Sequence, residues 1–306
     1  MNHTALPPGH VERLARARLS LDGLSVGDAF GEQFFLTANR PFFSDDVPPL
    51  PPGPWGYTDD TEMALGILDV LTERGTIDQD ALAQRFGVRF LQDRSRGYGP
   101  GAIRLLMSVS AGGDWQLESK ALFSGTGSYG NGTAMRIAPL GAYFADDLIR
   151  AAEEAAKASE VTHRHPDGIA GGVALAVAAA FTWANRHRAA EPSFRGDFFD
   201  AVLTHTPKTD TRDQIERARS IEPTMTSVSA AHLLGNGSQI SCQDTVPFCL
   251  WQITKFIGDY PAAIWETVRQ GGDIDTTAAI VGGVVVLATG REAIPTDWLA
   301  RREELK

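Results

Sequence analysis

The chain has 306 residues, of which 43% are hydrophobic and 22% are charged, so it can build a large core and is not intrinsically disordered. Its 28 Lys and Arg residues against 38 Asp and Glu residues give a net charge of −10. This acidity argues against extended nucleic-acid binding, which depends on clustered cations. It does not prevent local binding of an anion at a helix N-terminus.

The N-terminal stretch MNHTALPPGHVERLA has prolines and charges where an export signal needs an unbroken apolar core. Two uncharged stretches, 168–185 and 276–290, approach the length of a membrane span, but they are rich in Ala and Gly, as central helices of soluble proteins often are. Cys242 and Cys249 provide no disulfide framework and are typical of a reducing compartment. We therefore expect a cytoplasmic protein that does not cross a membrane.

Apolar residues recur at helical spacing from Leu14 to Leu24 and from Ala64 to Leu71, whereas strand-like alternation is scarce. Gly, Pro, Asn and Asp separate further helical patterns. These patterns cover residues 78–92, 100–111, 132–145, 147–161, 167–187, 196–205, 227–234, 244–257, 259–270 and 276–289. The sequence predicts an all-α protein.

Two long segments are predicted to be irregular. Residues 41–54 contain six prolines, and 204–226 form a polar stretch that contains two. Long loops of this kind often cover functional sites in compact proteins. Because no repeat or flexible tether is present, we expect one domain over 11–306, preceded by a disordered N-terminus at 1–10.

Two acidic segments begin helices: GYTDDTE at 56–62 and GGDIDTT at 271–277. The simplest interpretation is helix capping, by Asp59 with Glu62 in a capping box and by Asp275 in the second segment. Each segment also brings two carboxylates and a threonine to an apolar helix, where clustered carboxylates repel unless a cation neutralises them. Oxygen-only ligands favour Mg²⁺ or Mn²⁺ over zinc, and four carboxylates could hold two ions.

Three further segments are candidates for ligand binding. The glycine-rich loop 125–132 permits close approach to a diphosphate before a predicted helix that contains Arg136, itself a candidate for a structural ion pair. His163 precedes another helix, where a capping or surface role is the alternative. The loop 97–101 contains Tyr98, for which an exposed aromatic in a tight turn is the simplest interpretation.

The segments YTDDTEMALGI, GSYGNGTAMRIAPLG, the Thr-His pair of VTHRHPDG, and GGDIDTTAAIVGG, with GDAFGEQF before them, follow the order of the ADP-ribosylglycohydrolase family, which the chain resembles over nearly its whole length. The resemblance implies a compact helical bundle with a central cleft, two Mg²⁺ ions, and hydrolysis of the bond between C1″ of ADP-ribose and an acceptor. The implied metal ligands are Thr58, Asp59, Asp60, Asp273, Asp275 and Thr276.

The resemblance also implies the residues that contact substrate: Tyr98, Gly99, Gly127, Ser128, Tyr129, Gly130, Asn131 and His163. Asp60 and Asp275 are candidates for the catalytic carboxylate, which would deprotonate water or stabilise an oxocarbenium-like charge. Glu32 is a third candidate, although the family's carboxylate lies further beyond the glycine, where this chain has Phe34 and Phe35. We expect Asp28 to brace the helix end beneath the cleft.

The resemblance favours an ADP-ribosylated arginine on a protein as substrate, with ADP-ribose as product. Serine-linked, nucleic-acid-linked and small-molecule-linked ADP-ribose are the alternative substrates. Two other classes are a non-catalytic ADP-ribose binder and a metal phosphoesterase that cuts the diphosphate. The six oxygen-bearing side chains at the expected metal positions argue against the binder.

Overall fold

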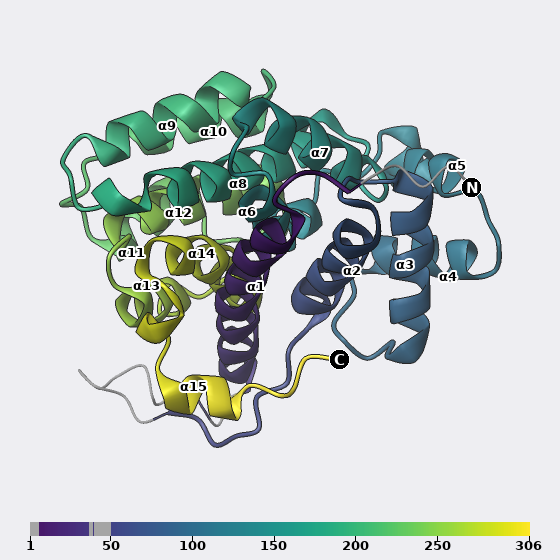
Figure 1. The fold of residues 1–306 in the computed structure, drawn as a ribbon, viewed down its shortest axis with the longest axis horizontal. Coiled ribbons are helices and arrows are strands. Elements are labelled where there is room, and N and C mark those ends of the chain that lie inside the picture. Colours follow the sequence, from purple (N-terminus) through teal and green to yellow (C-terminus); the bar gives the residue numbers. More distant parts are fainter. Residues whose placement is uncertain (1–5, 37–38, 40–49) are drawn as a thin grey trace.

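The computed structural model describes residues 6–36, 39 and 50–306, and over these residues the chain is all-α, with no β-strand, as predicted (Figure 1). The α-helices of this part of the chain are α1 His10–Glu32, α2 Asp59–Arg74, α3 Gln79–Gln92, α4 Pro100–Ser110, α5 Trp115–Ala121, α6 Ala138–Tyr143, α7 Leu148–Glu160, α8 Pro166–Asn185, α9 Phe194–His205, α10 Asp210–Ser220, α11 Ser227–Leu234, α12 Cys242–Lys255, α13 Tyr260–Val268, α14 Ile274–Thr289 and α15 Thr296–Arg301.

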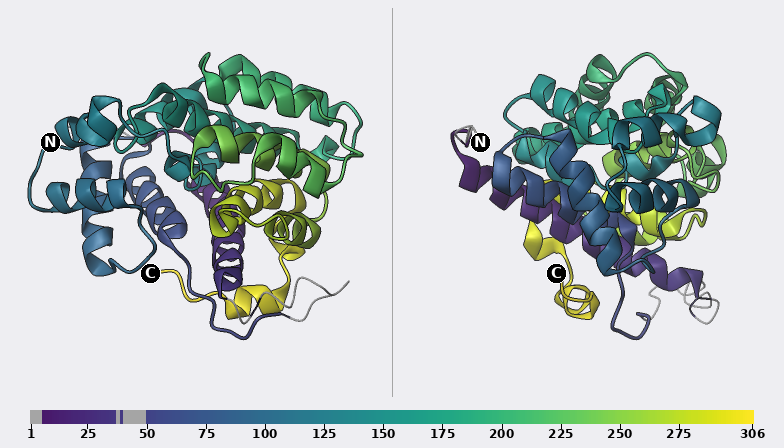
Figure 2. Two further views of the ribbon diagram at one scale, coloured as in Figure 1. Left: turned by 180° about the vertical axis from the view of Figure 1, so that it is seen from behind. Right: turned by 90° about the vertical axis from the view of Figure 1, so that its right-hand side faces the viewer.

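Helices α1 and α14 lie against each other at the centre of the molecule, as Figures 1 and 2 show from opposite sides. Three glycines of α1, spaced four residues apart, make this close approach possible. A Cβ atom would lie 2.4 Å from the Gly282 carbonyl oxygen at Gly23, 2.2 Å from that of Ala278 at Gly27, and 2.7 Å from that of Ile274 at Gly31. These three glycines therefore determine how the acidic start of α14 lies beside the end of α1.

Replacing Gly27 by Ala should destabilise the protein by about 3 kcal/mol or more, because the added methyl group would overlap backbone and force the two helices apart. Gly196→Ala on α9 is the matched control, since a Cβ there meets nothing within 4 Å. Urea unfolding of both variants measures the difference. Equal midpoints for Gly27→Ala and the wild type would show that the helix contact tolerates the methyl group.

An aromatic cluster anchors the segment that leads into α2. Phe30 of α1 stacks on Trp298 of α15 with ring centroids 4.5 Å apart, and it meets the buried Trp55 edge-on at 5.2 Å. The Trp55 amide donates to the Arg301 carbonyl at 2.6 Å, and the Glu303 amide donates to the Trp55 carbonyl at 2.9 Å. These contacts hold residues 55–58, and with them the start of α2, beneath the end of α1.

Two predictions of secondary structure were wrong. Residues 204–226 are not one irregular segment, because Thr209 caps α10 and Ile215 and Ala218 bury one face of that helix. The helix predicted at 132–145 is limited to α6, because a short 3₁₀ turn at Asn131–Thr133 and an irregular stretch come first and Pro139 occupies its first turn. Most of the proline-rich segment 41–54, and residues 1–5 of the expected disordered N-terminus, lie outside the described residues.

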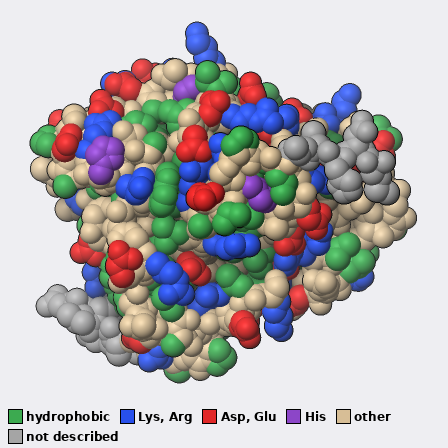
Figure 3. All heavy atoms as spheres, viewed as in Figure 1, with side chains coloured by type: hydrophobic (Ala, Val, Ile, Leu, Met, Phe, Trp, Pro, Cys, Tyr) green, Lys and Arg blue, Asp and Glu red, His purple; other side chains and the backbone are tan. Residues whose placement is uncertain are grey.

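One stretch, Pro166–Arg188, is long and apolar enough to cross a membrane by length and composition, but 83% of its apolar window is buried against the rest of the protein. Burial of this extent is typical of a core helix. Cys242 and Cys249 are both buried and unpaired on α12. On the face seen in Figure 3, basic and acidic side chains are interspersed, without a continuous basic area among the described residues.

Candidate active site

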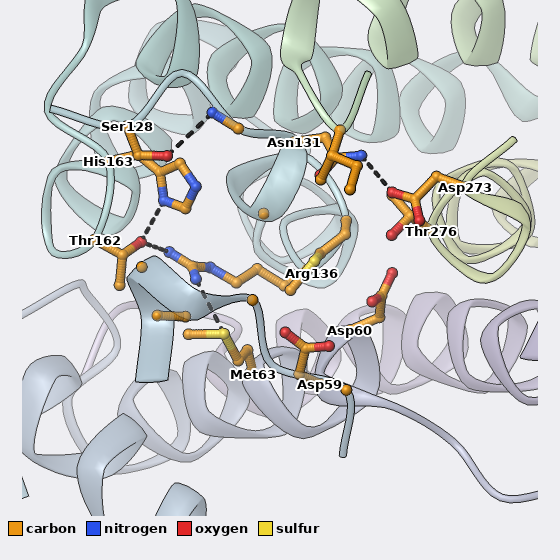
Figure 4. Close-up of a pocket in the computed structure, with 18 of the residues that line it drawn as sticks. Asp59, Asp60, Met63, Ser128, Asn131, Arg136, Thr162, His163, Asp273 and Thr276 are labelled. Carbon is orange, nitrogen blue, oxygen red and sulfur yellow. Dashed lines mark hydrogen bonds between the residues drawn. The ribbon is translucent and has the colours of Figure 1, made fainter. Parts of the chain in front are cut away.

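A cavity of about 390 Å³ lies between the start of α2, the start of α14, the glycine-rich loop and the turn before α8. Figure 4 shows Asp59 and Asp60 on one side, Asp273 and Thr276 at the same end, and Ser128 and His163 at the other end. We call these the carboxylate end and the donor end. The predicted residues that line the cavity are Asp59, Asp60, Gly99, Ser128, Tyr129, Gly130, Asn131, His163, Asp273, Asp275 and Thr276.

The start of α2 is built on the buried carboxylate of Asp28. This carboxylate accepts hydrogen bonds from the amide and hydroxyl of Thr58, at 3.0 and 2.9 Å, and from the amide and hydroxyl of Thr61, at 3.1 and 2.5 Å. Asp28 therefore braces the helix start, as expected from the sequence. The N-cap is Thr58 and not Asp59, and Glu62 pairs with Arg89 at 2.7 Å instead of completing a capping box.

The start of α14 also differs from the capping interpretation. Asp273, not Asp275, occupies the N-cap position, and no side chain caps the helix. Asp273 Oδ2 accepts from Asn131 Nδ2 at 2.7 Å, while Asp275 Oδ1 accepts from the Thr276 amide at 2.8 Å. Helix capping therefore does not account for Asp59, Asp60 or Asp275.

Burial raises the pKa of each carboxylate at this end, and repulsion from neighbouring carboxylates adds to the effect for Asp59, Asp60 and Asp275. Desolvation is the larger cause throughout, and it raises the pKa of Asp28 to about 6 and that of Asp59 to about 7. The pKa values of Asp60 and Asp275 lie well above the ordinary range, since each carboxylate is buried beside other carboxylates. Without a cation, the carboxylate end therefore retains protons that free aspartates would lose.

These groups fit a hard divalent cation by their chemistry. All six side chains expected as ligands offer oxygen, and Asp60 Oδ1 is buried without a hydrogen-bond partner in the part of the chain that the structure describes. The single hydroxyl proton of Thr58 serves either Asp28 or Asp60 Oδ2, at 2.9 and 3.1 Å, so Asp60 is poorly satisfied. Among the described residues, no three His, Cys, Asp or Glu side chains already stand together as a ligand set. Side-chain rotation would therefore accompany cation binding.

Chelator-treated protein should lose stability as the pH rises from about 4 to 8. The raised pKa values of Asp28 and Asp59 mean that the folded state binds protons which the unfolded chain releases near its ordinary value of 3.8. Their joint contribution to the free energy of unfolding is complete below that value and is lost through about pH 7, by on the order of 7 kcal/mol. Urea unfolding at several pH values measures it, and saturating Mg²⁺ should restore stability at pH 8.

Asp59→Asn should flatten this pH dependence. Asp93→Asn should not, because hydrogen bonds from Ser95 lower the pKa of Asp93 and it titrates below that range. Chelated wild-type protein that becomes more stable between pH 5 and 8 would contradict the assignment.

The glycine-rich loop exposes fewer backbone donors than the sequence suggested. The Gly130 amide donates to Ser128 Oγ at 3.1 Å, and the Asn131 amide donates to the Ile240 carbonyl at 3.4 Å. The loop ends in a single 3₁₀ turn, so no long α-helix begins directly after it. Ser128 Oγ accepts from Gly130 and so keeps its proton for another acceptor.

Four predicted residues do not line the cavity. Tyr98 is neither a wall of the cavity nor exposed: it is buried, with its ring centroid 5.1 Å from that of Phe90. Gly127 has a φ of 76°, and a Cβ there would lie 2.7 Å from the His165 amide, which indicates a role in chain packing. Thr58 is buried against Asp28, and Glu32 is half-buried at the end of α1, close enough to raise the pKa of Asp275.

Sequence reasoning missed a hydrophobic rim of the cavity. Phe123 is 57% exposed, Ile240 is 62% exposed, and both adopt left-handed backbone conformations, with φ of 51° and 52°. Such conformations are costly for these residue types and concentrate at functional sites. The Phe123 ring lies beside that of Tyr129, with centroids 6.3 Å apart. No sequence pattern marks a left-handed Phe or Ile, although Phe123 lies two residues before Gly125, the first glycine of the predicted loop.

Known proteins are similar to this chain over most of its length. The family model described as ADP-ribosylglycohydrolase matches residues 10–306. ADP-ribosylhydrolase ARH3 of Xenopus tropicalis is 27% identical over 336 residues, covering 96% of this chain and 92% of its own. The human ARH3 is 26% identical over 329 residues, covering 95% and 90%. An uncharacterized protein of Archaeoglobus fulgidus is 29% identical over 290 residues, covering 90% and 88%.

Among solved structures, one described as an ADP-ribosylglycohydrolase-related protein complex has a TM-score of 0.62 and 24% identity, covering 96% of this chain and 94% of that chain, which supports the fold. The helical fold, the carboxylate-lined cavity and the matches together define an enzyme that hydrolyses glycosyl bonds. The chain belongs to the ADP-ribosylglycohydrolase family. Its activity is the hydrolysis of ADP-ribose linkages.

Proposed function

We propose that the protein uses two divalent cations, Mg²⁺ or Mn²⁺, to hydrolyse the C1″ bond of ADP-ribose attached to an arginine side chain of a protein. The observation that carries this proposal is the convergence of two acidic helix starts, from α2 and α14, on one end of a cavity in a chain of this family. The expected ligands are Thr58, Asp59, Asp60, Asp273, Asp275 and Thr276. A cation bound there would supply Lewis-acid chemistry toward water and the ribose oxygens.

Asp60 and Asp275 are the proposed catalytic carboxylates. Both line the cavity, and Asp60 Oδ1 has no hydrogen-bond partner among residues 6–36, 39 and 50–306, so it is free to receive a proton from water. Carboxylates at this end would also stabilise the positive charge that builds on the anomeric carbon. Glu32 remains a third candidate from outside the cavity wall.

The rest of ADP-ribose would extend toward the donor end. Ser128 and His163 offer hydrogen bonds there, and the exposed rings of Phe123 and Tyr129 offer a flat surface on which an adenine base would stack. The ribose would thereby be held at the carboxylate end. This orientation supports cleavage at C1″ over attack on the diphosphate.

The choice of arginine as acceptor rests on the resemblance, and the negative charge of the carboxylate end is compatible with a guanidinium. Its test is a mass-spectrometric comparison of arginine-, serine- and nucleic-acid-linked ADP-ribose, each with Mg²⁺ and with chelator. We expect release from the arginine conjugate in Mg²⁺. Release from serine or nucleic acid, with arginine untouched, would leave the hydrolase assignment intact and reject the acceptor.

A further inference from the structure

Arg136 is a fully buried cation without a carboxylate partner among the described residues. Its guanidinium lies 4.7 Å from the centroid of the Phe86 ring. It donates to Met63 Sδ at 3.3 Å, to the Ala158 carbonyl at 3.3 Å and to Thr162 Oγ1 at 2.7 Å (Figure 4). The expected structural ion pair is therefore not formed. The shortest of these hydrogen bonds instead joins Arg136 to the turn that carries His163.

The hydrogen bonds of Thr162 Oγ1 have a fixed direction. Arginine can only donate, so Thr162 Oγ1 accepts from Arg136. The same oxygen lies 2.7 Å from His163 Nδ1, the one acceptor within hydrogen-bond distance of it among the residues that the structure describes. Thr162 is 3% exposed, and an unused hydroxyl proton there would be costly. The arrangement that satisfies both groups has Thr162 donating to Nδ1, so the neutral imidazole carries its proton on Nε2.

The other ring nitrogen faces the cavity. His163 lines it, and Nε2 has no hydrogen-bond partner within the described part of the chain. A Cβ atom would lie 3.4 Å from Nε2 at Gly130 and 3.2 Å from it at Gly132, so both glycines keep this side of the ring open. Removal from water and the nearby Arg136 both lower the pKa of His163, which keeps the ring neutral at physiological pH.

We propose that Arg136 and Thr162 are positioning residues that hold His163 in its Nε2–H form, so that the ring presents a fixed neutral donor to an oxygen of the bound ligand. The acceptor chemistry is that of a diphosphate or ribose oxygen, and this part rests on the proposed function. With the opposite tautomer, the Nε2 lone pair would face the same oxygen and repel it. Because Arg136 can only donate, it fixes the direction of the Thr162 hydroxyl proton, and this proton in turn fixes the tautomer of His163.

The tautomer is measured directly by ¹⁵N NMR of histidine-labelled full-length protein, with and without ADP-ribose. We expect a single Nε2–H form in the wild type and in Thr162→Ser, which keeps the hydroxyl. Thr162→Val has nearly the same shape but cannot donate, and it should admit the Nδ1–H form. The affinity of Thr162→Val for ADP-ribose should fall about tenfold, because the Nε2 hydrogen bond to a charged ligand group is lost whenever Nε2 carries a lone pair in place of a proton.

A double-mutant cycle separates positioning from a merely structural role. If Thr162 acts through His163, Thr162→Val should change ADP-ribose affinity little in a His163→Ala background. An Nδ1–H ring in the wild type, or a full Thr162→Val effect without His163, would overturn the proposal. A single Nε2–H tautomer in wild-type protein that does not bind ADP-ribose would instead reject the proposed function and leave the tautomer assignment standing.

Discussion

Replacing Asp275 by Asn should lower single-turnover release of ADP-ribose by at least ~10²-fold while weakening ADP-ribose binding much less. The substitution keeps the size of the side chain and one oxygen but removes the charge that a cation at the carboxylate end requires. Binding is affected less, because the donor end of the cavity does not depend on this residue.

The control for this experiment is Asp213→Asn, which changes an exposed aspartate on α10. It should leave both turnover and binding unchanged. Glu32→Gln in the same assay tests the third carboxylate, and a loss as large as that of Asp275→Asn would place Glu32 in the catalytic group. Turnover of Asp275→Asn equal to the wild type would remove this residue from the mechanism.

Replacing Gly130 by Val should abolish most ADP-ribose binding in a protein that remains folded. A Cβ at this position lies 3.2 Å from Ser128 Oγ and 3.4 Å from His163 Nε2, so branched methyl groups would fill the donor end. The backbone φ of Gly130 is −59°, which any residue adopts, so the effect is steric and not conformational. Calorimetric titration with ADP-ribose measures it.

Gly130→Ala provides a graded comparison. Its single methyl group makes tight but tolerable contacts, so its affinity should lie between those of the wild type and Gly130→Val. Unfolding curves confirm that each variant is folded. If both variants bind ADP-ribose like the wild type, the ligand does not occupy the donor end.

The fold was predictable from the sequence where helices are amphipathic or broadly apolar. The predicted range 227–234 coincides with α11, and the apolar helix at 276–289 begins only two residues later than α14. Helix α10 was missed because it is mostly charged and buries only Thr211, Ile215 and Ala218. A composition-based interpretation treats such a helix as a loop.

Candidate residues of the cavity were predictable because they lie in compact motifs at helix starts. The hydrogen bonds that these residues form could not be predicted from the sequence. Asp59 and Thr58 both have capping side chains, and only the contact of Thr58 with Asp28, 30 residues away, selects Thr58. Tyr98 sits in a glycine-rich turn whose sequence is compatible with exposure, but the ring turns inward onto Phe90.

The contact between Arg136 and Thr162 spans 26 residues, and no local pattern indicates it. Long-range contacts of this kind depend on how α7 and the turn before α8 pack beside the irregular segment after the glycine-rich loop. Sequence periodicity identifies the buried face of each helix, but it does not show which loops contact each other in the folded protein.

Identification of the released product tests the central claim most directly. Wild-type protein is mixed in excess with an ADP-ribosylated arginine peptide, in Mg²⁺ or in chelator, and the products are resolved by mass spectrometry. Cleavage at C1″ predicts intact ADP-ribose and unmodified peptide in Mg²⁺, with little of either in chelator. AMP with a peptide that retains ribose phosphate would show attack on the diphosphate. Tight binding of ADP-ribose and Mg²⁺ without release from arginine, serine or nucleic-acid conjugates would contradict the hydrolase account.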